Sequence, residues 1–304
     1  IECRLVGSEM CIRDSYSLVA IGFVLIFRAT DVLSFAQPAM VVVGAGFISY
    51  FATQLGIPFI FAFIIGIILT GLLGFILERT FLRPMVGEPV FSVAVLTIGI
   101  DILLRVVLDN WIGINPKYMG DPFPSYGNFG SLDIGGLTVK YLEVTALITS
   151  LVLISILSVF FKRSKYGVAM RATSLDQEAA LAQGINVGRV FGLVWFIAGL
   201  LAAFAGFFIT GGFNTLTNTS FISALRALPA VVIGGLDSIT GAIIGSLIIG
   251  LTQAYVGYYQ FDIESAYNIK LGNGFSIVAP YLIMFVILLV KPHGLFGTEE
   301  VERV

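Results

Sequence analysis

Long apolar runs, separated by short polar or glycine-rich segments, dominate the pattern of hydrophobic positions along the chain. A helix that rises about 1.5 Å per residue needs about 20 apolar residues to cross a hydrocarbon layer about 30 Å thick. Runs of about that length predict membrane-spanning helices, and the period-two alternation typical of barrel strands is absent. We expect these helices near residues 38–55, 58–77, 90–108, 141–161, 190–209, 238–256 and 276–290.

The composition of the chain agrees with this pattern. Hydrophobic residues make up 57% of the 304-residue chain and charged residues only 12%. This balance leaves too few polar side chains to cover a water-soluble fold, so it predicts an all-α polytopic membrane protein embedded in a lipid bilayer. With a net charge of −2, the chain shows no basic excess that would support nucleic-acid binding.

Residues 1–15, IECRLVGSEMCIRDS, differ in composition from the rest of the chain and hold both cysteines. They lack the apolar core and cleavage site of a secretory signal, and they resemble a translated sequencing-library adaptor. We expect this segment to be non-native, which leaves residues 16–304 as a single transmembrane domain. Its first apolar run, residues 16–27, forms only about 18 Å of helix, so we expect the start of that helix to be missing. A natural polar N-terminus before a short helix is the alternative.

Positive charge is distributed unevenly between the polar segments. Lysine and arginine concentrate after residue 77, in the insert at 162–189 and after the last run, whereas 109–140 and 257–275 contain few. Loops rich in these residues stay in the cytoplasm, so we place 162–189 inside and the two poor segments outside. The residues that decide this orientation are Arg79, Arg83, Lys162, Arg163, Lys165, Arg171, Arg189, Lys291 and Arg303.

The run at residues 221–236, FISALRALPAVVIGGL, is shorter than a span and is interrupted by Pro229. Such a piece is typical of a short span or of a re-entrant half-helix. Because the segments on both sides of it are expected outside, the run has to reach the cytoplasmic side or nearly so. The whole chain then has about eight spans.

Small residues recur at four-residue spacing on two of the runs. Gly241 and Gly245 form a GxxxG pair, and Ala198, Ala202 and Gly206 share one helix face. This spacing lets helix backbones approach closely in lipid. It fits either a subunit interface or packing inside one bundle, so we assign no site to it.

The polar insert RATSLDQEAALAQGI, residues 171–185, contains the signals of a short helix. Ser174 and Gln177 fit a capping box, which predicts a helix that begins near Leu175. Gly184 suits the position after the last helical residue. A helix of about nine residues cannot span the membrane and is held in the cytoplasm between two membrane helices. It is either a docking element for another protein or an ordinary helical loop.

The insert lies within the stretch GVAMRATSLDQEAALAQGINVGRVFGLVWFIAGLLAAFAG, and two further stretches are VLSFAQPAMVVVGAGF and LRALPAVVIGGLDSITGAIIGSLIIGL. Together they resemble the signature elements of branched-chain amino-acid ABC importer permeases of the LivH type. The resemblance extends over residues 16–296. Ser34, Gln37 and Pro38 replace the Asn, His and Gly that are commoner in the family. Asp237 stands at a usual Gly position, and these departures leave the substrate open.

The resemblance implies an ABC importer permease fold for residues 16–304, with a cytoplasmic coupling loop at 162–189. In this family the short helix of that loop docks in a cleft of a separate ATPase and transmits its nucleotide-driven closure to the membrane helices. The positions that match the family's coupling pattern are Arg171, Ala172, Asp176, Glu178, Ala179, Gly184 and Ile185.

The resemblance also implies the partners. They are two cytoplasmic ABC ATPase subunits, a second permease subunit, identical or homologous, and an extracytoplasmic substrate-binding protein, in the cytoplasmic (inner) membrane of a bacterium or archaeon. The chain lacks the phosphate-binding motif G-x-x-x-x-G-K-[ST], so we expect no cofactor in this chain and ATP with Mg²⁺ on the partner subunits. The implied cargo is leucine, isoleucine or valine, with urea or short amides as alternatives.

Polar groups inside the apolar runs are candidates for a substrate pathway, because they are costly in lipid unless they face a cavity or a partner. Gln37 and Pro38, with Ser34 before them, suit a broken helix that frees backbone carbonyls. A plain helix start with proline in its first turn is the alternative. Arg226 either meets a carboxylate or extends to the membrane interface.

Asp101 and Arg105 stand four residues apart on one helix face. They can pair with each other, or they can bind the charged groups of an amino acid. The only histidine, His293, follows the last run, so we expect a non-catalytic subunit without a metal site. A self-contained secondary transporter is the alternative function, but apart from Asp101 the runs offer almost no coupling carboxylate or lysine.

Overall fold

The structure is a computed structural model that describes residues 3–85, 88–113, 117–119, 131–134, 137–175, 177–211, 215–216, 220–267 and 275–297. The α-helices are α1 (Cys3–Thr30), α2 (Gln37–Ser49), α3 (Phe59–Leu77), α4 (Val90–Ile112), α5 (Tyr141–Arg163), α6 (Lys165–Leu175), α7 (Gln177–Ala182), α8 (Val187–Gly211), α9 (Ser220–Leu225), α10 (Ala227–Gly234), α11 (Ile239–Tyr267) and α12 (Phe275–Val290). Two π-helical turns, η1 (Tyr50–Gln54) and η2 (Glu78–Leu82), and a 3₁₀ turn, η3 (Arg83–Met85), extend α2 and α3. Strands β1 (Lys117–Tyr118) and β4 (Thr215–Leu216) pair antiparallel, as do β2 (Ser131–Ile134) and β3 (Leu137–Lys140).

The expected membrane helices are present. Among the described residues, five helices are long and apolar enough to cross a membrane: Phe59–Met85, Val90–Trp111, Val144–Arg163, Val187–Gly211 and Ile239–Gln260. Shorter apolar helices are Ser15–Thr30, Ser220–Gly234 and Phe275–Val290, and α2 with η1 accounts for the run predicted near 38–55. The prediction of an all-α polytopic membrane protein is therefore confirmed.

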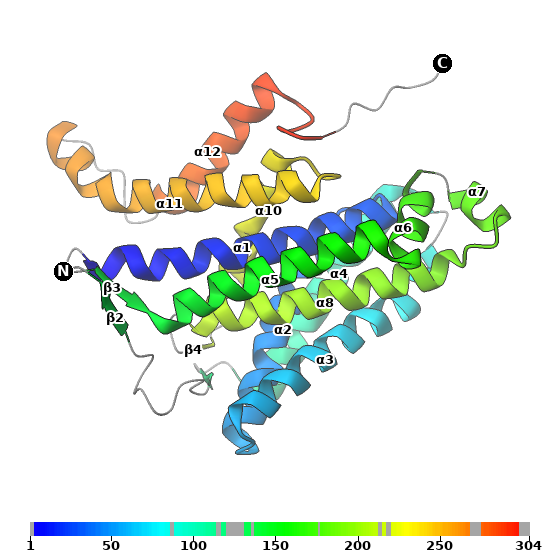
Figure 1. Cartoon of the computed structure of the whole chain (residues 1–304), viewed down its shortest axis with the longest axis horizontal. Helices are drawn as coiled ribbons and strands as arrows, with labels where there is room; N and C mark the ends of the chain where they lie inside the picture. The colour runs from blue at the N-terminus through cyan, green and yellow to red at the C-terminus, as the bar shows by residue number, and fades with distance from the viewer. Residues whose placement is uncertain are drawn as a thin grey trace.

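The two ends of the bundle differ in kind (Figure 1). Helix α1 lies against α5, α8 and α11, and α6 and α7 project at one end of these helices. Strands β2, β3 and β4 lie at the opposite end. The polar insert and the segment that precedes α5 are thus on opposite sides of the bundle, as the distribution of positive charge predicts.

The first helix continues through residue 15, where the composition of the sequence changes. Helix α1 begins at Cys3 and continues without interruption to Thr30. The domain boundary after residue 15, and the non-native origin of the residues before it, stay predictions.

The short segment at 221–236 is a pair of short helices, α9 and α10, as its length and composition predict. The break between them lies at Arg226 and not at Pro229. Pro229 is the third residue of α10, where a backbone N–H would have no partner within the helix, so proline does not interrupt it.

Helix α8 forms the core of the bundle. Of its span, 72% is buried inside the protein, against 11% for the span in α5. Ala198 and Ala202 are fully buried, and the backbone of Gly206 lies directly against the carbonyl of Val41 on α2. Two turns earlier in α8, Gly199 touches the backbone of Thr70 on α3. The small residues of α8 therefore allow close approach of two neighbouring helices.

The GxxxG pair of α11 packs inside the same chain. A Cβ at Gly241 would collide with the carbonyl of Gly234, and a Cβ at Gly245 with the carbonyl of Ala230, both on α10. Of the two interpretations of this pair, the structure supports packing within one bundle.

We expect Gly206→Ala and Gly245→Ala to destabilise the folded protein by about 1–3 kcal/mol, because the added methyl group meets a backbone carbonyl that cannot turn away. Gly99→Ala on α4 is the matched control, since a Cβ there has nothing within 4 Å. Thermal unfolding of the purified protein in detergent measures the difference. Equal midpoints for all three variants would contradict these helix contacts.

Candidate functional site

The polar insert contains two helices, α6 and α7, where the sequence predicted one. Helix α6 begins after Ser164, whose hydroxyl accepts a hydrogen bond from the Gly167 N–H at 3.0 Å and so caps the helix. Ser174 lies in the last turn of α6, and its hydroxyl donates to the Arg171 carbonyl at 3.0 Å. The predicted capping box was therefore wrong, because the earlier cap at Ser164 already places Ser174 inside a helix.

The predicted end of the short helix is confirmed. Gly184 has φ of 79°, and its N–H donates to the Leu181 carbonyl at 2.9 Å. The Ile185 N–H donates to the Ala180 carbonyl at 3.0 Å, which completes a Schellman ending. Asn186 then caps α8 by accepting from the Arg189 N–H at 3.1 Å. Only a tight turn separates α7 from the core helix, so displacement of α7 is passed to the first turn of α8.

The predicted coupling residues fall into two groups. Arg171 donates to the Phe161 carbonyl of α5 at 2.5 Å, and Ala172 and Ile185 pack against the core. Ala179 and Gly184 are exposed on the outer side of the insert. Asp176 lies outside the described residues, as does the side chain of Glu178.

Exposed leucines accompany the second group. Leu175 is 87% exposed and Leu181 is 57% exposed, at the end of α6 and within α7. Apolar side chains exposed on a polar insert at the end of a helix bundle are typical of a surface that another protein covers.

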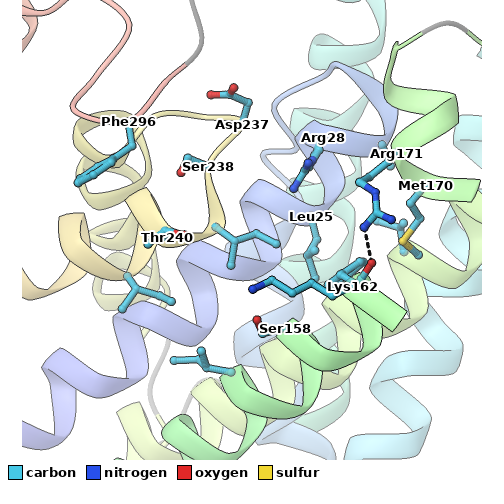
Figure 2. Close-up of a pocket in the computed structure, with 16 residues that line it drawn as sticks. Leu25, Arg28, Ser158, Lys162, Met170, Arg171, Asp237, Ser238, Thr240 and Phe296 are labelled. Carbon is cyan, nitrogen blue, oxygen red and sulfur yellow. Dashed lines mark hydrogen bonds between the residues drawn. The ribbon is translucent and has the colours of Figure 1, made fainter. Parts of the chain in front are cut away.

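A cleft of about 470 Å³ opens beside the insert, between α1, α5, α6 and the start of α11. Figure 2 shows Arg28, Lys162 and Arg171 on one side of it and Asp237 and Ser238 on the other. The positive side chains outnumber the carboxylate, so the cleft favours anions. The distribution of charge along the sequence singled out Lys162 and Arg171, but it missed Arg28, which ends the first helix.

A second polar site lies inside the bundle, where α2 begins. Gln37 is fully buried, its Nε2 donates to the Ala198 carbonyl at 3.2 Å, and it lies against the backbone of Gly22. The Phe35 N–H donates to the Thr97 hydroxyl at 3.1 Å. Gly22, Thr97 and Ala198 lie well inside α1, α4 and α8. The non-helical residues 31–36 therefore lead from the end of α1 back into the interior of the bundle.

The start of α2 has features of both structures expected from the sequence, the broken helix and the plain helix start with proline in its first turn. Pro38 lies in the first turn of α2, and that first turn is itself inside the bundle, as in a broken helix. The Ser34 hydroxyl oxygen and Gln37 Oε1 are buried, and neither atom has a hydrogen-bond partner among the described residues. Buried polar atoms of this kind are available to a ligand or to water.

The remaining charged residues of the bundle differ in their surroundings. Arg105 pairs with Asp101 on α4 and lies 3.9 Å from the ring centroid of Phe221 on α9. This geometry supports the structural pair over a binding role. Arg226, at the break between α9 and α10, is partly buried, and its Nε has no hydrogen-bond partner among the described residues.

Sequence reasoning did not single out Glu78, which the structure places in the interior. Its side chain is only 1% exposed, in the π-helical turn η2. The available signal was a carboxylate that directly follows a long apolar run and precedes Arg79 and Arg83.

Known proteins resemble the chain over nearly its whole length. It is 26% identical over 305 residues to the high-affinity branched-chain amino acid transport system permease protein BraD of Pseudomonas aeruginosa, covering 97% of this chain and 95% of that protein. It is 27% identical over 306 residues to the corresponding permease protein LivH of Escherichia coli, with 96% and 94% covered. The probable LivH of Methanocaldococcus jannaschii is 29% identical over 294 residues, with 93% and 88% covered. Residues 14–290 match the family described as the branched-chain amino acid transport system, permease component, so the chain belongs to this family of transport permeases.

Proposed function

We propose that this chain is the membrane-spanning permease subunit of an ATP-driven importer that moves branched-chain amino acids by alternating access. The single structural observation that carries this proposal is the exposed helix α7, which a Schellman turn and the cap at Asn186 join directly to the core helix α8. A force applied at α7 therefore acts on the helix that contacts α1, α2 and α3.

The chemistry of ATP is assigned to other subunits. Two cytoplasmic ABC ATPases bind ATP and Mg²⁺, and their closure moves α7. A second permease subunit completes the pathway, an extracytoplasmic binding protein delivers the substrate, and the assembly lies in the cytoplasmic membrane of a bacterium or archaeon. Family membership and the absence of a Walker motif in the chain support this division of labour.

The pathway has to serve a zwitterion with an aliphatic side chain, that is leucine, isoleucine or valine. The polar groups of Ser34 and Gln37 and the backbone freed before α2 provide hydrogen bonds to the charged ends of such a molecule. The buried apolar residues of α1 and α2 surround these polar groups and suit the aliphatic part. This combination of few polar groups within an apolar wall is typical of small-molecule sites.

Combining Glu178→Lys with Gly184→Val tests the docking role of α7. Valine disfavours the left-handed backbone at position 184, where φ is 79°, so the Schellman ending is lost. We expect substrate-stimulated ATP hydrolysis in reconstituted vesicles to be abolished while the protein remains folded in the membrane. Gly56→Val is the control, because Gly56 has φ of 64° and open space around it but precedes α3. Unchanged stimulation in the double variant would contradict the docking assignment.

Arg226→Ala tests the pathway role of the arginine between α9 and α10. If this guanidinium receives the substrate carboxylate, we expect initial leucine uptake to fall roughly tenfold, as for loss of one charged hydrogen bond. Arg226→Lys, which keeps the charge, should retain a larger share of uptake. Normal uptake by Arg226→Ala at equal expression would assign the residue to the membrane interface instead.

A further inference from the structure

Glu78 is a carboxylate buried at the cytoplasmic end of α3. Its side chain is 1% exposed, and neither carboxylate oxygen has a hydrogen-bond partner among the described residues. One oxygen lies 3.5 Å from Nε of Arg83, in the next turn of the chain. A buried charge is costly unless it is paired, so this arginine is held in place by Glu78.

The same arginine reaches across to the core helix. An Arg83 side-chain nitrogen donates to the Gly188 carbonyl at 2.6 Å, in the first turn of α8. A Cβ at Gly188 would lie 2.7 Å from that nitrogen, so only glycine leaves room for the guanidinium in this position. Gly188 stands four residues after Gly184, which ends the α7 turn. Arg83 thus joins the end of α3 to the part of α8 that follows the coupling helix.

The turn that carries Glu78 is suited to movement. η2 is a π-helical turn, a rare geometry that occurs frequently at functional sites. Glu78 also lines a pocket of about 260 Å³, and Gln177 of α7, Asp31 and Val32 line the same pocket. Asp31 has φ of 59°, the only described non-glycine residue with a positive φ. The first residues of the connection 31–36, which leads into the buried start of α2, therefore border the same pocket as α7.

We infer that Glu78, Arg83 and the carbonyl of Gly188 form a link that transmits displacement of α7 to the end of α3 and to the connection 31–36. This inference rests on the proposed function and adds positioning residues to it. The link converts motion at the first turn of α8 into motion at η2, because Arg83 donates a hydrogen bond to Gly188 and is ion-paired with Glu78 of η2. The pocket provides the space into which η2 and residues 31–36 move.

The test uses the complete transporter in vesicles, made of this permease, its second permease, the ATPases and the binding protein. Radiolabelled leucine uptake and ATP hydrolysis are measured together, and their ratio reports coupling. ATP-driven leucine uptake by the wild-type complex tests the proposed function, whereas differences in ratio between variants test the link. For Arg83→Gln we expect the ratio to fall roughly fivefold or more, with basal ATP hydrolysis and copurification of the ATPases retained.

Two variants distinguish transmission from simple charge neutralisation. Gly188→Ala displaces the guanidinium without removing any charge, and we expect it to lower the ratio as well. Glu78→Gln combined with Arg83→Gln removes both charges and leaves no unpaired buried carboxylate. We expect this double variant to remain uncoupled, since the bond to Gly188 is still missing. A wild-type ratio in the double variant or in Gly188→Ala would overturn the link.

Arg79→Gln is the matched control, because Arg79 of the preceding turn η2 carries the same charge but its side chain is exposed. We expect it to keep the wild-type ratio. A loss equal to that of Arg83→Gln would overturn the link in favour of a general effect of surface charge.

Discussion

Direct contact between helix backbones at the small residues of α8 is the constraint on which the rest of the structure depends. In lipid, burial of apolar side chains gives little preference for helix association, so close packing and polar contacts have to hold the bundle together. Gly199 and Gly206 meet the backbones of α3 and α2, and Gly74 of α3 meets the backbone of Trp195. Contacts this close leave α8 little freedom to slide, because every shift has to carry its neighbours with it.

Because α8 is packed this closely, movement of the proposed coupling helix α7 would move α8 and its neighbours together. Helix α7 itself is small and makes little contact with the rest of the bundle. The Schellman turn at Gly184 and the cap at Asn186 nevertheless join it directly to α8. Near its middle, α8 supplies the Ala198 carbonyl, which accepts a hydrogen bond from the side chain of Gln37, the first residue of α2. A single helix thus connects the exposed helix α7 with the polar groups in the interior. In the proposed function, this connection is how ATP hydrolysis on a separate chain acts on a pathway with few polar groups.

Patterns that depend on local physics were predictable from the sequence. Hydropathy placed the spans, lysine and arginine counts placed the insert and the segment before α5 at opposite ends of the bundle, and the left-handed turn at Gly184 was expected because glycine favours that conformation. The cap at Ser164 was equally local and was overlooked, which led to the wrong helix start near Leu175. The roles of the coupling residues and of Ser34, Gln37, Pro38 and Arg226 stay predictions.

Features that depend on tertiary contacts were not predictable. Nothing in the local sequence shows that Gln37 is seated against Gly22 and Ala198, or that the helix break lies at Arg226. The burial of Glu78 was not predictable, because it depends on Gly192 of α8 being placed beside it by helix packing. Such positions are determined by contacts between residues far apart in the chain.

The most direct test of the central claim is to ask which energy source drives uptake. The complete transporter is reconstituted in vesicles, and the binding protein and radiolabelled leucine are added on the extracytoplasmic side. The energy source is either ATP on the cytoplasmic side or an imposed sodium or proton gradient. The account predicts leucine accumulation that requires ATP and stops when this chain is omitted. Accumulation driven by an ion gradient through this chain alone, without ATP or an ATPase, would contradict it.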